Sequence, residues 1–112
     1  MKIAAPLLFL ALTAICNPGH AAGEGTAIVT ELGQLNGIAL ACNQPALVSR
    51  ARNVVVTTAP KTREIGEVFE NATNAAYLEQ GKGLTPCPDG ATLSGRIAAS
   101  EKRLQAAFPK AP

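Results

Sequence analysis

The sequence has few of the side chains that catalysis and metal binding use. It contains no tryptophan and one tyrosine, and its single histidine and single methionine, His20 and Met1, both lie near the N-terminus. Beyond residue 21 there is no histidine for a nucleophile–histidine pair, a zinc site or a haem ligand. A Cys-x-x-Cys redox motif and a phosphate-binding glycine loop are also missing. These absences predict a protein that is not an enzyme and that holds no cofactor or metal.

Residues 1–21 have the pattern of a secretory signal peptide. Lys2 supplies a positive charge, and a nearly continuous apolar run over 6–15 follows it. This run is too short to cross a bilayer as a helix. The small residues near Ala21 and Ala22 predict cleavage between these two positions, with an uncleaved membrane anchor as the alternative. We therefore expect the mature protein to be periplasmic or secreted.

The three cysteines divide between the signal and the mature chain. Cys16 follows Ile15, whereas a lipid-attachment cysteine follows a small residue, so we expect Cys16 to be removed with the signal. Cys42 and Cys87 remain in the mature chain, 22–112. Two cysteines in an exported domain are expected to pair, and two free buried thiols are the alternative. A bridge between them closes a long loop and stabilises the fold by about 4 kcal/mol through the entropy of the unfolded chain.

The mature chain has a nearly balanced charge and a core that must be aliphatic. Removal of Lys2 lowers the formal net charge from +2 to about +1, which is too small to attract nucleic acid or an anionic membrane. The remaining chain, 22–112, is long enough for one domain with a modest core. Because aromatic residues are scarce and alanine is common, close packing of helices is favoured over a β-sandwich.

Hydrophobic periodicity predicts four helices, at about 26–42, 45–58, 60–80 and 91–108. The second segment contains a valine-rich run, 54–58, that would also suit a strand. In each segment the apolar residues recur at spacings of three and four and form one stripe. The stripes comprise, in chain order, Ile28, Leu32, Leu35, Ala39 and Cys42; Leu47, Ala51, Val54 and Thr58; Ile65, Val68, Phe69, Ala72, Ala75, Ala76 and Leu78 or Glu79; and Leu93, Ile97, Ser100 or Glu101, Leu104 and Phe108.

Four amphipathic helices with short connections predict an all-α fold, a small antiparallel four-helix bundle. If the helices alternate in direction, Cys42 at the end of the first and Cys87 before the last fall at the same end. The disulfide then clips the bundle at that end. Gly33 and Gly37, four residues apart on the first helix, predict either a close contact with a neighbouring helix or a shallow groove.

Basic residues cluster around the connection between the second and third predicted helices. They are a candidate site for an acidic partner, although such residues often only solvate a corner. Tyr77 is the candidate anchor of a contact, because tyrosine is enriched in interfaces. Our leading hypothesis is a non-enzymatic exported protein that acts by protein–protein binding, without nucleic acid or stable membrane insertion. The basic cluster consists of Arg50, Arg52, Lys61 and Arg63.

Two other functions are consistent with the sequence. Glu64, Glu67 and Glu70 recur every three residues on the third helix and would gather a metal or a small molecule, although such rows usually form a solvated face. The second of these functions is that of a structural component of the cell envelope. In size, export signal and single disulfide, the chain resembles small helical periplasmic proteins such as acid-stress chaperones and immunity proteins against secreted amidase toxins. This resemblance implies an inhibitor, immunity or chaperone-like role and assigns no residue, since no motif is shared.

We expect the mature protein, purified without reductant, to have a mass two hydrogens below that of the reduced chain that begins at Ala22. It should react with no alkylating reagent, and reduction should lower its Tm by more than about 10 °C. The reason is that about 4 kcal/mol is lost and small domains shift by about 4–8 °C per kcal/mol. Mass spectrometry and thermal melts measure both effects, and two alkylated thiols in freshly exported protein would contradict the pairing.

Overall fold

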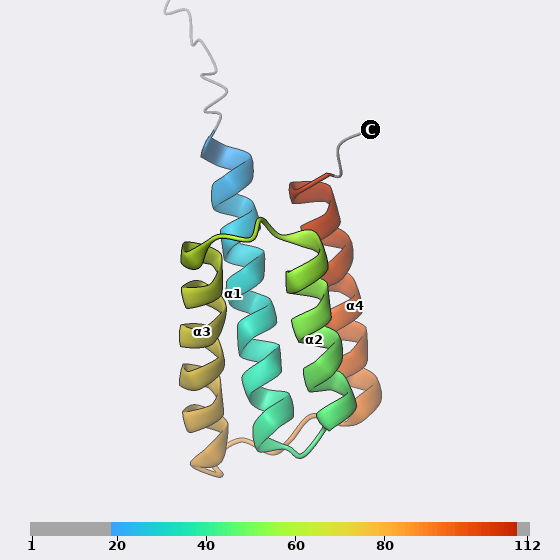
Figure 1. Ribbon diagram of the computed structural model, residues 1–112. Helices are drawn as coiled ribbons and strands as arrows, with labels where there is room; N and C mark the ends of the chain where they lie inside the picture. The colour runs from blue at the N-terminus through green and yellow to red at the C-terminus, as the bar shows by residue number, and fades with distance from the viewer. Residues whose placement is uncertain (1–18, 110–112) are drawn as a thin grey trace, which may run out of the picture.

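The computed structural model describes the backbone of residues 19–109 and the side chains of residues 23–109. Each helix runs opposite to the one before it in the chain (Figure 1). The described residues form no strand, and the run 54–58 is helical, so the predicted all-α fold is confirmed. In chain order the helices are α1 (Gly19–Ala41), α2 (Pro45–Thr58), α3 (Arg63–Gly81) and α4 (Gly90–Ala107).

Three of the four predicted helices are close to those observed. α2 has the predicted bounds, with Pro45 in its first turn, where proline suits the backbone. α3 begins three residues later than expected because Thr62 caps it, accepting a hydrogen bond from the Ile65 backbone N–H at 3.2 Å. Asp89 caps α4 by accepting from the Thr92 backbone N–H at 2.7 Å. This hydrogen bond lowers the pKa of the Asp89 carboxyl below its ordinary value.

The N-terminal bound of α1 was predicted wrongly. The helix begins at Gly19, not near residue 26, and so includes the end of the predicted signal peptide, 19–21. Alanine at positions 21 and 22 favours helix, and the Phe108 ring lies where a side chain at Gly25 would be, which anchors this end of the helix to the end of α4.

The prediction of a signal peptide concerns a part of the chain that is mostly not described. The apolar run 6–15 and Cys16 lie outside the described residues, and the expected cleavage point between Ala21 and Ala22 falls in the first turn of α1. Within the described part of the chain, no helix combines the length and the hydrophobicity needed to cross a membrane.

The C-terminal end of α1 positions the disulfide. Asn43 adopts a left-handed conformation with φ 61°, and the Gln44 N–H donates to the Ala39 carbonyl at 2.8 Å. This pattern is a Schellman cap, which ends the helix and turns the chain sharply. Cys42 therefore lies in the turn and bonds to Cys87, with 5.8 Å between their Cα atoms. The predicted disulfide is confirmed, at the end of the bundle where the alternating helices bring both residues.

The core is centred on α1. This helix packs against the other three, α2 also packs against α4, and the backbone of α3 approaches closely only that of α1. In Figure 1, α1 accordingly lies between α3 and α2. The fold is thus the predicted four-helix bundle, in which α1 contacts each of the other three helices and α3 packs against α1.

Gly33 and Gly37 make the contact between α1 and α3. A methyl group at Gly33 would lie 2.7 Å from the Ala72 side chain and 2.7 Å from the Phe69 carbonyl oxygen. One at Gly37 would lie 2.8 Å from the Tyr77 backbone nitrogen. The contacts advance in the same direction along both helices, so α1 and α3 are parallel. The predicted close contact at these glycines is therefore confirmed, and its partner is the backbone of α3.

The predicted apolar stripes account for most of the core. Ile28, Leu32 and Ala39 of α1 are fully buried, as are Leu93, Ile97 and Leu104 of α4. On α3 the assignment of Leu78 to the stripe was wrong, since this residue is 66% exposed. The helix turns its small side chains and Thr73 towards α1, so Leu78 points away. The buried positions outside the predicted stripes are Val29, Asn36, Val55, Ala59 and Thr73.

Replacing Gly33 or Gly37 by alanine should lower the free energy of unfolding by up to about 2 kcal/mol. Overpacking costs about 1–3 kcal/mol, and the higher helix propensity of alanine offsets about 1 kcal/mol of it. The same change at Gly66 and Gly95, which have nothing within 4 Å of an added methyl group, should stabilise the protein. Urea unfolding followed by circular dichroism measures all four variants. Equal gains at all four glycines would show that α3 does not depend on this contact.

Candidate binding groove

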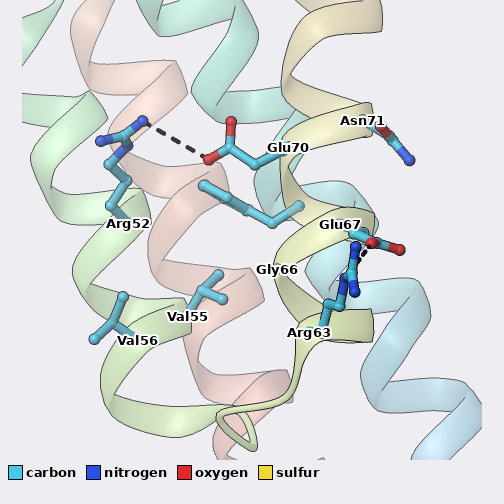
Figure 2. Close-up of a pocket in the computed structure, with 9 residues that line it drawn as sticks. Arg52, Val55, Val56, Arg63, Gly66, Glu67, Glu70 and Asn71 are labelled. Atoms are coloured by element: carbon cyan, nitrogen blue, oxygen red, sulfur yellow. Dashed lines mark hydrogen bonds and ion pairs between the residues drawn. The ribbon is translucent and has the colours of Figure 1, made fainter.

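A groove runs between α2 and α3 because these two helices do not pack against each other. It has a volume of about 580 Å³ and lies near the connection between the two helices (Figure 2). Residues three and four apart on a helix share a face. Each of the two helices turns one such face towards the groove, and this face supplies the lining residues. The lining residues are Arg52, Val55 and Val56 of α2, and Arg63, Gly66, Glu67, Phe69, Glu70 and Asn71 of α3.

The inner surface of the groove is apolar. Phe69 and Val55 are buried members of the core whose side chains also border the groove. Val56 is 59% exposed, which is high for a valine on a helix that packs on two sides. Gly66 contributes no side chain and so leaves the α3 wall open. Together they form a hydrophobic surface that a partner or ligand can cover.

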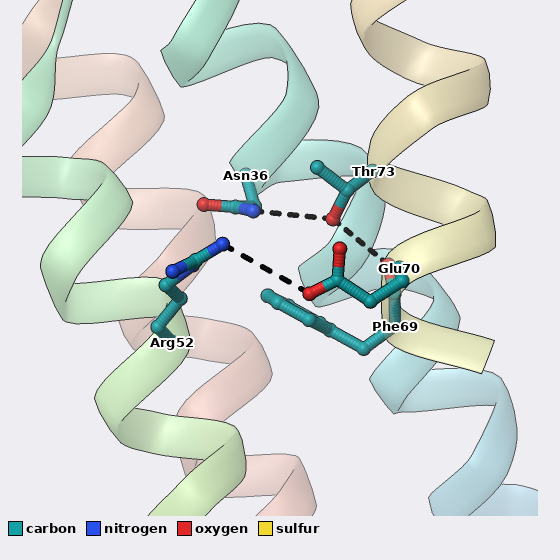
Figure 3. Close-up of polar contacts among 5 residues, drawn as sticks. All are labelled: Asn36, Arg52, Phe69, Glu70 and Thr73. Carbon is teal, nitrogen blue, oxygen red and sulfur yellow. Dashed lines mark hydrogen bonds and ion pairs between the residues drawn. The ribbon is translucent and has the colours of Figure 1, made fainter. Parts of the chain in front are cut away.

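The rim of the groove carries charges of both signs. Arg52 of α2 reaches across to Glu70 of α3, with 3.9 Å between Nη2 and Oε1 (Figure 3). On α3 itself, the Arg63 Nε donates to Glu67 Oε1 at 3.0 Å. All four side chains are more than half exposed, so these ion pairs contribute little to stability. These four side chains can therefore leave their ion pairs and contact a binding partner at little cost in stability.

A buried polar pair lies on the inner side of this region. Asn36 of α1 is fully buried, and its Nδ2 donates to the Thr73 hydroxyl of α3 at 3.1 Å. The Thr73 hydroxyl in turn donates to the Phe69 carbonyl oxygen at 2.8 Å. The Asn36 Oδ1 atom is buried and has no hydrogen-bond partner. The turn of α3 that supplies Phe69 and Glu70 to the groove is thus tied to a polar residue with one unfilled acceptor.

The structure divides the predicted basic cluster among different surfaces. Arg52 and Arg63 line the groove, whereas the Arg50 Nη1 donates to the Ser94 hydroxyl of α4 at 2.8 Å and so faces another helix. Lys61 lies exposed in the connection before α3. Tyr77 is 48% exposed and lies about 21 Å along α3 from Arg63, given a rise of about 1.5 Å per residue. Only two of the five predicted contact residues therefore share the groove.

The row of glutamates on α3 is engaged by arginines. Glu67 pairs with Arg63 and Glu70 with Arg52, while Glu64 lies exposed in the first turn of the helix. Within the described residues, no three histidine, cysteine or acidic side chains lie close enough together to hold a metal ion. The row is therefore part of a mixed-charge rim rather than a separate acidic cluster.

Sequence reasoning missed the apolar and buried parts of this site. Val56 belonged to a run that was considered only as core or strand, and Phe69 was assigned to the core alone. The available signal was Asn36, a polar residue four positions after Leu32 on the inner side of α1. A polar side chain on a buried face requires partners, and this one has too few.

Two other hollows border α1, the first between α1 and α4 and the second between α1 and α3. They share Gln34 and Ile38 and have volumes of about 380 and 480 Å³. The Arg103 Nη1 donates to Glu31 Oε2 at 2.6 Å across one of them. Both are smaller than the groove between α2 and α3.

Comparison with models of known protein families, with curated proteins and with solved structures finds no match to this chain.

The ion pair between Arg52 and Glu70 should contribute little to folding. Replacing each residue by alanine, singly and together, should give a coupling energy of no more than about 0.5 kcal/mol, because both side chains are exposed and separated by more than a hydrogen-bond distance. A double-mutant cycle of urea unfolding measures this coupling. The pair Arg103 and Glu31, at 2.6 Å, is the internal comparison and should couple more strongly. A larger coupling for Arg52 and Glu70 would mean that the pair is structural.

Proposed function

We propose that this protein is an exported, non-enzymatic binding protein and that a segment of its protein partner lies in the groove between α2 and α3. The observation that carries this proposal is the groove itself, an apolar surface of Val55, Val56 and Phe69 left open between two helices. Exposed apolar surface with a polar rim is typical of protein interaction sites.

The disulfide and the N-terminal sequence support an exported location. A disulfide persists in oxidising environments, such as the periplasm or the outside of the cell, and the bond between Cys42 and Cys87 joins the end of α1 to the connection before α4. The signal-like pattern of residues 1–21 also supports export to such a compartment. We therefore infer a periplasmic or secreted protein.

A binding role is also supported by the chemistry that the groove offers. Its charged groups are two arginines and two glutamates in exposed pairs, and it has no histidine, cysteine, serine or threonine among its lining residues. Such a site holds a partner by apolar contact and by charge complementarity, which raises association rates and sets orientation. An inhibitor, immunity or chaperone-like role uses these properties.

A small-molecule ligand is the second candidate, favoured by the volume of the groove. Sites for small ligands enclose about 300–1,000 Å³, and this groove has about 580 Å³. A thermal-shift screen separates the two candidates, since a ligand that binds only the folded state raises Tm with concentration. A rise of several degrees with a small molecule would favour this candidate, whereas a co-purifying protein would favour the first.

We expect a photo-reactive phenylalanine analogue in place of Val56 to cross-link to the partner in an extract of the cell envelope or of secreted proteins. The same analogue in place of Leu84 should not, because Leu84 is 80% exposed but lies in the connection before α4, outside the groove. Val56→Glu should abolish capture of the cross-linked partner by placing a charge on the apolar surface, and Leu84→Glu should leave it unchanged.

Circular dichroism of the two glutamate variants provides the control, since both positions are exposed and both variants should remain helical. Equal cross-linking from positions 56 and 84, or equal loss of capture in both glutamate variants, would place the contact elsewhere on the molecule and overturn the proposal.

A further inference from the structure

We propose that the hollow between α1 and α4 binds a small organic carboxylate. Arg96, Ser100 and Arg103 of α4 would hold the charged end, and the apolar body would lie over α1 towards α3. This inference goes beyond the proposed function, since the hollow shares no lining residue with the groove between α2 and α3. It is carried by a nearly buried hydroxyl group that has no hydrogen-bond partner and borders a hollow with two arginines.

The hydroxyl group belongs to Ser100, which is 5% exposed and lines the hollow. The hydroxyls of Thr30, Thr57 and Thr73 each donate to the backbone carbonyl four residues earlier, as helical hydroxyls often do. The Ser100 hydroxyl makes neither this bond nor any other in the described part of the chain. Among the described side-chain oxygens and nitrogens, only Asn36 Oδ1 is both fully buried and unpaired. The Ser100 oxygen therefore keeps a small exposed area, at which a ligand atom would gain a hydrogen bond.

Two arginines flank this hydroxyl on the same face of α4. Arg96 lies four residues before Ser100 and Arg103 three residues after it, so the three side chains leave the helix on one side, and all three line the hollow. Arg96 is exposed and makes no ion pair or hydrogen bond with the described residues. Ala99 lines the hollow between the two arginines with only a methyl group, which leaves room for an anion. A hydroxyl and two guanidinium groups can all donate to a carboxylate.

The Glu31 carboxylate limits the charge of the ligand. It accepts from the Arg103 Nη1 at 2.6 Å and also lines the hollow. The lining residues therefore carry two positive charges and one negative charge, and the excess of one positive charge suits an anion with a single charge. Because a guanidinium has five N–H donors, Arg103 can keep its bond to Glu31 and bind the ligand as well.

The floor of the hollow suits an apolar body. Leu35 and Ile38 of α1 line it, and Ile38 also lines the adjoining hollow, whose α3 wall includes Ala75 and Ala76. The two hollows, of about 380 and 480 Å³, are in the range of sites for small ligands, about 300–1,000 Å³. The charged residue of the α3 wall is Glu79, which repels a carboxylate. The charged end of the ligand would therefore lie at α4, with its carbon chain directed over Ile38 towards α3.

The probe is hexanoate, and three compounds that each change one of its properties are the comparisons. Binding to the oxidised mature protein is followed by NMR chemical-shift titration, with the Arg96 Nε–H and the Ser100 backbone amide as local reporters. Hexanoate should bind at least about tenfold more tightly than 1-hexanol, which has no charge, and than hexylamine, which has the opposite charge. It should exceed acetate by a similar factor, because acetate lacks most of the carbon chain.

The variants give effects of opposite sign. Ser100→Ala should weaken hexanoate binding about tenfold while the free protein stays at least as stable in urea, because the hydroxyl loses no partner and alanine favours helix. Arg96→Gln should also weaken binding about tenfold. Glu31→Gln should tighten binding several-fold, since it removes the negative charge beside Arg103. Lys102→Gln is the matched control for Arg96→Gln, because it removes the same charge from an exposed position of α4 outside the hollow. It should leave binding unchanged.

Absence of hexanoate binding, equal binding of hexanoate and 1-hexanol, or equal losses in Arg96→Gln and Lys102→Gln would overturn the inference. A Ser100→Ala variant that binds hexanoate normally, or that is less stable than the natural protein, would overturn it too, since the hydroxyl would then serve the fold. These outcomes leave the proposed function as it stands, because cross-linking from Val56 tests the groove, whose lining residues are all different.

Discussion

The close contact of α3 with Gly33 and Gly37 of α1 is the constraint on which the arrangement of this molecule depends. Without side chains at these positions, the backbones of α1 and α3 approach until an added methyl group would collide. This approach draws α3 onto α1 and away from both α2 and α4, whose backbones it does not approach closely. Gly33 and Gly37 lie on α1, which α2 also contacts. By drawing α3 onto α1, they leave the space between α2 and α3 open.

The same contact explains why α3 needs to be held at its ends. Its shared surface with the core is narrow, and only Ile65, Phe69 and Thr73 of this helix are buried. At its C-terminal end, the Gln80 Nε2 donates to the Thr85 carbonyl oxygen at 2.8 Å and orders the following connection. The disulfide between Cys42 and Cys87 then ties this connection to the end of α1. The covalent bond adds stability that the small buried surface of α3 does not provide.

The groove combines features that stability alone does not favour. Phe69 and Val55 belong to the core and also border an open space, and Val56 is exposed beside them. The ion pair between Arg52 and Glu70 is weak. Outside the lining of the groove, the buried oxygen of Asn36 has no hydrogen-bond partner. An apolar residue at position 36 would remove the cost of burying that oxygen. Polar groups that are buried without partners commonly mark a place where a protein gives up stability for function.

The sequence alone determined the helices, their order and the pairing of the cysteines. Pro45, Thr62 and Asp89 begin helices by local chemistry, and stripes such as Ile28, Leu32, Leu35 and Ala39 identify the buried faces without reference to the rest of the chain. Which helices pack against each other was decided only by the tertiary structure. The spacing of Gly33 and Gly37 predicts a close contact but does not say which helix makes it, because any helix with small side chains fits against two glycines. Only the packing of the helices against one another decided that Arg50 faces α4 while Arg52 faces the groove, and that Asn36 meets Thr73. Such pairings depend on distances between residues far apart in the chain, which periodicity does not contain.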